Sequence, residues 1–311
     1  MTSFSLNMDG FRVGHATDDE ARTGCTVVLS EEGATGGVHV KGAAPASLET
    51  DALRPGRLTQ TAHAILLSGG SAFGLHAAAG VQSYLEQRSA GFSTGSYHVP
   101  IVPAAAIYDL EVGDGSVRPG PNMAKTACEN ASNTCEIGRI GAAAGATIGK
   151  AFGPAHAQPG ALGAAVTTLK RDVRVAAIVA VNCVGDLRDP ADGNIIAGAR
   201  DDQGRFMDGA ERFRSLDEEE APGFTRNNTI VGTILTNADL SCEQCCKLAS
   251  SGFDGLARVV YPASTMSDGD LLFALASGHA SAQLPADALL TGAADAVRTA
   301  ILSPFQDRAS G

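Results

Sequence analysis

Large aromatic side chains are scarce in this sequence. It has no tryptophan, only 5% of its 311 residues are aromatic, and it contains 37 glycines. A core with so few rings must be built from small and branched aliphatic side chains, and glycine lets neighbouring backbones approach closely. These features predict closely packed layers joined by many tight turns, in a mixed α/β protein.

Positive charge is also in short supply. The chain has 23 lysines and arginines against 34 aspartates and glutamates, which gives a net charge of −11. This acidic balance argues against binding to nucleic acid or to an anionic membrane. No apolar run approaches the length that spans a bilayer, and the first residues lack the basic and apolar segments of a signal peptide. We therefore expect a cytoplasmic protein.

Cysteines are few and odd in number. Seven are scattered along the chain, which favours reduced core thiols over a disulfide framework. Cys242, Cys245 and Cys246 form one cluster, but no second cysteine pair follows it and no histidine lies nearby. Their helical spacing favours packing against a core over metal binding. The seven histidines show no paired ligand spacing either, so we expect no metal and no cofactor.

The apolar pattern alternates hairpins with helices of small residues. Residues 23–29 and 37–40 are predicted to be two strands paired around a turn at 31–33. Ser241 to Gln244 is a capping box, which predicts a helix from there towards Val260. Six further features have clear patterns: a strand at 62–67, a helix at 72–86, a hairpin of 166–169 and 173–181, strands at 229–237 and 271–276, and a helix at 285–303. The polar stretch 198–227 is predicted to be irregular.

The junction between Asn228 and Thr229 is the most informative feature of the chain. It separates the polar stretch 198–227 from a segment rich in β-branched residues, 229–237. If the bond is cut, Thr229 gains a free α-amine with a pKa of about 7.7–8.0. This amine can act as the base that activates the hydroxyl of the same residue. The simpler interpretation is that Asn228 ends a loop and Thr229 starts a strand.

Other catalytic motifs are incomplete. Ser71, within residues 69–74, resembles a nucleophile elbow, but Phe73 stands where the second glycine is required. The same loop lacks the lysine and hydroxyl pair of a phosphate loop. A tight turn at Gly70 and Ser71 that offers N–H donors to a substrate is a more modest role.

Three further polar positions admit both a structural and a catalytic interpretation. Lys150 ends a run of small residues and is either a solvated charge or a side chain directed into a cleft. Asn182 interrupts an apolar strand and is either a turn former or an amide that donates to an oxyanion. Asp268 and Asp270 form either an acidic turn or a pair that orients a cationic amine.

Together, the order and spacing of these motifs are similar to those of the P1 family of self-processing peptidases, which includes β-aminopeptidases, D-aminopeptidase/esterases and nylon-oligomer amidases. The resemblance covers nearly the whole chain. The segments that carry it are 13–18, 21–29, 49–51, 69–75, 99–105, 107–110, 180–182, 228–229 and 268–274. It implies a four-layer αββα sandwich of the N-terminal-nucleophile type, with family-specific connectivity, formed by a single catalytic domain of residues 1–311. It also implies cleavage into chains 1–228 and 229–311 and assembly as a homotetramer.

The resemblance assigns a role to each candidate residue. Thr229 is the nucleophile, Lys150 the catalytic lysine and Asn182 the oxyanion amide. Tyr108 lines the substrate pocket, and Asp268 and Asp270 belong to the polar network around the nucleophile. A threonine nucleophile places the chain nearer the nylon-oligomer amidases than the members that use serine. Two positions depart from the family pattern: Ser264 replaces a histidine, and His76 replaces an aspartate.

The implied function is hydrolysis of amide bonds in small peptides or amino-acyl amides. Thr229 first attacks the Asn228 carbonyl, and water hydrolyses the resulting ester. The freed amine then activates the same hydroxyl for attack on a substrate. Two alternatives stay open from the sequence: an acyltransferase like the ornithine acetyltransferases, which share a related fold, and an unprocessed binding protein without catalytic activity.

Overall fold

The computed structural model describes residues 2–217 and 228–308. Its strands form one continuous hydrogen-bonded path that bends into two packed sheets. The order along the path is β12 (Ala161–Thr168), β13 (Arg174–Val181), β16 (Val231–Thr236), β18 (Leu271–Ala276), β3 (Thr23–Val40), β5 (Thr61–Ser68), β8 (Ala104–Ala106) and β4 (Ser47–Leu48), and β2 (Arg12–Asp18) also pairs with β3.

Short strand pairs and helices complete the chain. The pairs are β1 (Thr2–Ser5) with β9 (Thr134–Ile137), β6 (Phe92–Ser93) with β7 (His98–Val99), β10 (Thr147–Ile148) with β11 (Gln158–Pro159), and β14 (Asp186–Arg188) with both β15 (Ile195–Ala197) and β17 (Val260–Tyr261). The α-helices are α1 (Ser71–Gly74), α2 (Ala78–Glu86), α3 (Pro121–Glu129), α4 (Gly209–Arg214), α5 (Cys242–Leu256) and α6 (Ala286–Leu302). The 3₁₀ turns are η1 (Thr50–Leu53), η2 (Leu75–Ala77), η3 (Gly141–Ala143), η4 (Lys150–Phe152), η5 (Pro154–His156), η6 (Lys170–Asp172) and η8 (Ser303–Arg308).

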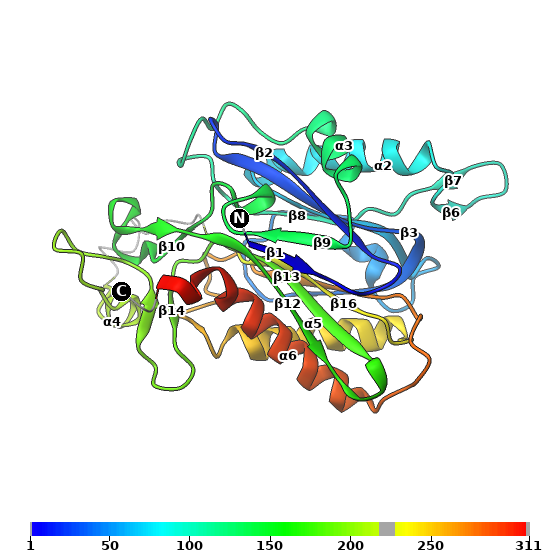
Figure 1. Ribbon diagram of the computed structural model, residues 1–311. Helices are drawn as coiled ribbons and strands as arrows, with labels where there is room; N and C mark the ends of the chain where they lie inside the picture. The colour runs from blue at the N-terminus through cyan, green and yellow to red at the C-terminus, as the bar shows by residue number, and fades with distance from the viewer. Residues whose placement is uncertain (1, 218–227, 309–311) are drawn as a thin grey trace.

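Three hydrophobic clusters fill the spaces between four layers. The first sheet contains β13, β16 and β18, and the second contains β5 and the first part of β3. One cluster lies between the first sheet and α5 and α6, a second lies between the two sheets, and a third lies between the second sheet and α2 and α3. Side chains of β13 alternate between the first two clusters, so that Ile178 faces the other sheet while Val179 faces the helices. Figure 1 shows α2 and α3 on one side of the strands and α5 and α6 on the other. The predicted αββα sandwich is confirmed.

Strand β3 corrects one expectation. Residues 23–29 and 37–40 do not pair with each other; they belong to one strand of 18 residues. Its first part pairs with β2, and its last part, from Thr35 to Val40, pairs with β18 in the other sheet. Polar residues at 30–33 therefore mark the bend where a strand passes between sheets, and not a hairpin turn.

Other boundaries differ less. The helix expected at 72–86 is broken by η2, and the stretch expected to be irregular contains α4. The first strand of the 166–181 hairpin begins earlier, at Ala161, and β16 begins at Val231, two residues after Thr229. The capping box at Ser241 and the strand at 271–276 are confirmed. Residues 218–227 of the polar stretch lie outside the described residues. No described helix has the length and apolar character needed to span a bilayer.

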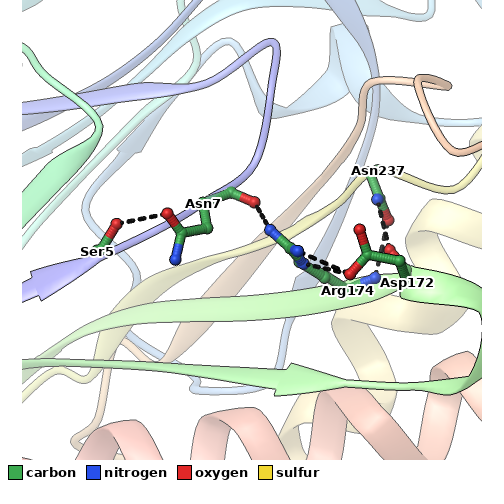
Figure 2. A network of polar contacts seen from close by, with 5 residues as sticks. All are labelled: Ser5, Asn7, Asp172, Arg174 and Asn237. Carbon is green, nitrogen blue, oxygen red and sulfur yellow. Dashed lines mark hydrogen bonds and ion pairs between the residues drawn. The ribbon is translucent and has the colours of Figure 1, made fainter.

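A polar network fastens the β12–β13 hairpin to its neighbours (Figure 2). The guanidinium of Arg174 pairs with Asp172 at 2.7 Å and donates to the backbone carbonyl of Asn7. The Arg174 N–H donates to Asn237 Oδ1 at 2.8 Å, just after β16. These bonds fix one end of β13 relative to β16. The opposite end of β13 carries Asn182.

Candidate active site

Three neighbouring strands of the first sheet bring predicted catalytic residues together at one end of the strands. β13 and β16 are antiparallel, with Ala180 opposite Val231, and β16 and β18 are parallel, with Val231 opposite Leu271. The end of β13 therefore lies beside the starts of β16 and β18. Asn182, Thr229 and the segment 268–270 are adjacent for this reason, although they are far apart in sequence.

The bond before Thr229 is surrounded by hydrogen-bond donors. The Thr229 hydroxyl donates to the carbonyl oxygen of Asn228, and the Gly269 N–H donates to the same oxygen at 2.9 Å. The Thr229 N–H donates to the backbone carbonyl of Asn182 at 2.7 Å. The Gly269 N–H can stabilise negative charge on this oxygen, and the hydroxyl lies against the same carbonyl group. This arrangement suits attack at the carbonyl carbon of Asn228.

Gly269 is required by this packing. A Cβ atom at this position would lie 2.8 Å from Thr229 Oγ and 2.7 Å from the Ala44 carbonyl oxygen. Any larger residue would displace the Thr229 hydroxyl or the backbone around it. The glycine between the two aspartates thus keeps its N–H against the Asn228 carbonyl.

Lys150 and Asn182 form a buried pair next to this bond. Lys150 is only 6% exposed, and its Nζ donates to Asn182 Oδ1 at 2.9 Å. The backbone of Lys150 is held by the segment that follows Asn182, because its N–H donates to the Val184 carbonyl at 2.9 Å. The solvated interpretation of Lys150 is therefore wrong.

The hydrogen bonds of Asn182 fix the direction of its amide. Its Oδ1 accepts from Lys150 Nζ and from the Thr147 N–H at 3.0 Å. Donors on this side require an oxygen, so the NH₂ group must face the other way. There its Nδ2 donates to the Tyr108 carbonyl at 3.2 Å. An amide oriented in this way directs its N–H groups away from Lys150.

Burial controls the charges in the site. Burial lowers the pKa of Lys150 to about 8, although the nearby thiol of Cys183 and the carboxylates of Asp268 and Asp270 oppose this shift. Burial and the adjacent Asp268 raise the pKa of Asp270 to about 7. Burial also raises the pKa of Asp268. A lysine that loses its proton easily and carboxyls that hold theirs are typical of functional sites.

The acidic segment is held by specific donors. Asp270 Oδ1 accepts from the Ile230 N–H at 2.7 Å, and its Oδ2 accepts from the N–H and the hydroxyl of Ser264, both at 3.0 Å. Asp268 Oδ2 accepts from the Thr265 N–H at 2.6 Å. Ser264, one of the two departures from the family pattern, is therefore part of the site. His76, the other departure, is an exposed residue in the turn η2.

A cavity of about 310 Å³ opens beside this group. Lys150, Thr147, Tyr108 and Glu111 contribute to its wall, and the Tyr108 hydroxyl donates to Glu111 Oε1 at 3.2 Å. The predicted position of Tyr108 in a pocket is consistent with this geometry. Thr147 and Glu111 were not identified from sequence, because nothing in the pattern separates them from ordinary strand and loop residues.

The loop that contains Gly70 and Ser71 is hydrogen-bonded to the residues on either side of Tyr108. The Gly70 N–H donates to Asp109 Oδ1 at 2.6 Å, and the Ser71 N–H donates to the Ile107 carbonyl at 2.9 Å. The expectation that these two N–H groups are offered to a substrate is not met, because both are used inside the protein. Contact of Gly70 or Ser71 with a substrate stays a prediction. The buried Asp109, which sequence reasoning did not single out, fixes this loop beside Tyr108.

Solved structures share this architecture. The L-aminopeptidase D-Ala-esterase/amidase of Ochrobactrum anthropi, described as a variant of the Ntn-hydrolase fold, superposes with a TM-score of 0.71 at 18% identity, over 98% of this chain and 87% of that one. A β-aminopeptidase of Burkholderia sp. superposes with a TM-score of 0.65 at 22% identity, over 97% of this chain and 87% of that one. These similarities define the fold class as that of the Ntn hydrolases.

The family follows from sequence. The chain belongs to peptidase family S58, whose pattern it matches over residues 6–306. It is 38% identical to an uncharacterized aminopeptidase of Mycobacterium tuberculosis over 88% of this chain and 80% of the relative. It is 33% identical to a 6-aminohexanoate-oligomer endohydrolase of Kocuria sp. over 87% of this chain and 74% of the relative. The predicted family and the predicted class, a hydrolase of peptide or amide bonds, are confirmed.

Proposed function

We propose that the chain cuts itself between Asn228 and Thr229 and that Thr229 then acts as an N-terminal nucleophile. The hydrogen bonds on the Asn228 carbonyl carry this proposal, since the Thr229 hydroxyl and the Gly269 N–H meet on one oxygen. A hydroxyl in this position is next to the carbonyl carbon that it would attack.

Self-cleavage has three steps. Thr229 Oγ bonds to the Asn228 carbonyl carbon, and the charge that develops on the carbonyl oxygen is stabilised by the Gly269 N–H. The proton that leaves Oγ passes to the amide nitrogen as the C–N bond breaks, which leaves an ester on Oγ and a free amine on Thr229. Water hydrolyses the ester and releases the Asn228 carboxylate. The products are chains 1–228 and 229–311.

The mature reaction uses the same hydroxyl. The free amine of Thr229 takes the proton from Oγ, Oγ attacks a substrate amide, and water resolves the acyl-enzyme. The backbone carbonyl of Asn182, which accepts the Thr229 N–H in the uncut chain, is placed to orient this amine. The positive charge of Lys150 nearby favours the neutral, basic form of the amine.

The other site residues have supporting roles in this proposal. Asn182 Nδ2 donates to the oxyanion of the substrate, and the Lys150 ammonium holds Asn182 in the required orientation. Asp270 positions Thr229 through the Ile230 N–H, and Asp268 balances the charge of Lys150. Tyr108 lines the substrate cavity.

The substrates are small peptides or amino-acyl amides, a proposal supported by family membership and by relatives named aminopeptidase and 6-aminohexanoate-oligomer endohydrolase. No observation favours the acyltransferase alternative. From the family resemblance, we also propose that the protein assembles as a homotetramer and is located in the cytoplasm.

Intact-mass measurement and a substrate panel test the proposal together. Purified protein should give two chains that end at Asn228 and begin at Thr229, and should hydrolyse amides with a free amino terminus. Adding amine acceptors distinguishes a hydrolase from an acyltransferase. An acyltransferase would transfer the acyl group to the amine in preference to water. A wholly uncut protein with full activity would contradict the mechanism.

A further inference from the structure

The cavity beside Lys150 contains two side chains of opposite charge. Arg22 and Glu111 both line it, together with apolar groups such as Val112 and Pro159. Within the described ranges, no ion pair of 4 Å or less joins Arg22 to Glu111 or to any other carboxylate. Arg22 therefore has no carboxylate partner among the described residues.

Arg22 differs from arginines whose charge is neutralised by an acid. Arg174 pairs with Asp172 (Figure 2), and Arg188 pairs with Asp208, each at 2.7 Å. No described residue forms a hydrogen bond, ion pair or ring contact with the Arg22 guanidinium. A half-buried arginine without a partner is unusual in a chain with net charge −11. Its position in the cavity wall points to an anionic ligand.

The backbone holds Arg22 in one position. Its φ of 57° lies in the left-handed region, which non-glycine residues seldom adopt. Gly145 packs so closely on the Arg22 carbonyl that a Cβ there would overlap it. The preceding N–H, that of Ala21, is fixed by Asp18 Oδ1 at 2.8 Å. The backbone of Arg22 is therefore held in a constrained turn at the cavity wall, and little ordering of the backbone accompanies ligand binding.

We propose that Arg22 binds a carboxylate of the substrate, so that the preferred substrates are short peptides or amino-acid oligomers with a free carboxyl end. This inference rests on the proposed function, because the cavity adjoins Lys150. A planar guanidinium can bind a carboxylate through two parallel hydrogen bonds.

Binding to an uncut, inactive protein tests the inference without turnover. Calorimetry on Thr229→Ala protein should be done with two matched pairs of probes: triglycine and triglycine amide, and the linear dimer of 6-aminohexanoate and its amide. These probes are achiral, so a preference for one stereoisomer does not affect the result. We expect the carboxylate of at least one pair to bind about 10- to 100-fold more tightly than its amide, as charge-assisted hydrogen bonds imply.

A second substitution in the Thr229→Ala protein, Arg22→Gln, should bring the ratio of the carboxylate's affinity to that of its amide close to one. Arg54→Gln removes the same charge from an exposed arginine that pairs with Asp51 and should leave the ratio unchanged. The inference would be overturned if the carboxylate still bound more tightly than its amide after Arg22→Gln. It would also be overturned if, in the protein that keeps Arg22, the two members of each pair bound equally or did not bind. Turnover by Thr229→Ala would instead contradict the proposed nucleophile and would leave the binding result valid.

Discussion

In the proposed mechanism the Thr229 hydroxyl serves two reactions, because it contacts the Asn228 carbonyl at the proposed cut and would carry the substrate acyl group afterwards. Thr229→Ala removes the nucleophile with little loss of buried volume, so it should give a folded, uncut chain with no measurable turnover. Thr229→Ser retains the hydroxyl and should keep partial processing. Intact mass and amide hydrolysis provide the measurements. Normal turnover by the alanine variant would redirect attention to Ser71.

Substitution of Asn182 is expected to lower kcat, and substitution of Lys150 is expected to slow both self-cleavage and turnover. Asn182→Ala removes the proposed oxyanion donor and should lower kcat by about 10²–10³-fold. Lys150→Ala should slow both self-cleavage and turnover, because both use the same hydroxyl. Lys150→Arg should not restore full activity, since a guanidinium is bulkier and arranges its donors differently.

Kinetics on processed protein and the rate of chain cleavage separate these effects, and urea unfolding checks that each variant is folded. Near-normal kcat in Asn182→Ala would show that its amide has only a structural role. Normal cleavage and turnover in Lys150→Ala would exclude the role proposed for the lysine.

Much of the site is predictable at the level of single residues, and the limits have physical reasons. The switch from polar to β-branched residues identifies Thr229, and the polar break in an apolar strand identifies Asn182. Thr147 and Gly269 act through their backbone N–H groups. Because every residue except proline has such a group, no side-chain pattern identifies them.

Among the elements, β14 and the turn before α4 meet at a buried carboxylate. Asp186 accepts from the N–H of Gly209 at 2.8 Å and of Ala199 at 3.2 Å. Burial nevertheless raises its pKa from 3.8 to about 6. The folded chain therefore binds this proton more tightly than the unfolded chain, and the contribution of Asp186 to stability improves as pH falls from about 6 towards 4.

Asp186→Asn removes this titration. The free energy of unfolding of the wild type, relative to the variant, should increase by about 2 kcal/mol between pH 7 and pH 4.5. Urea unfolding at the two pH values measures the difference. Asp254→Asn, at an exposed position of α5, should show no such change. An Asp186→Asn difference that is independent of pH would contradict the assignment.

The elements also show where sequence patterns mislead. β18 matches the predicted strand 271–276, because a short, wholly buried apolar run between polar residues defines both of its ends. β3 does not match, because the polar residues 30–33 have the composition of a turn. A bent strand that passes between two sheets exposes the same kind of residue at its bend. Only tertiary contacts distinguish the two cases.

On the scale of the whole molecule, the proposed cut divides the chain but not the core. β16 and β18 would belong to chain 229–311, yet they lie between β13 and β3, which belong to chain 1–228. The cluster between the sheets contains Ile178 and Val28 from one chain and Val231 and Phe273 from the other. Neither chain can bury these side chains without the other.

The two chains should therefore stay associated until the protein unfolds. Processed protein should elute in one native peak that contains both chains, at the same volume as uncut Thr229→Ala. Rising urea should separate the chains only across the cooperative unfolding transition, because removal of β16 and β18 exposes two of the three hydrophobic clusters. Chain 229–311 expressed alone should lack a cooperative transition, since β16 and β18 would lose their neighbours β13 and β3 and would expose the side chains that face the cluster between the sheets. Separation of the chains in native buffer, or independent folding of chain 229–311, would show that the sheet is not shared as the topology requires.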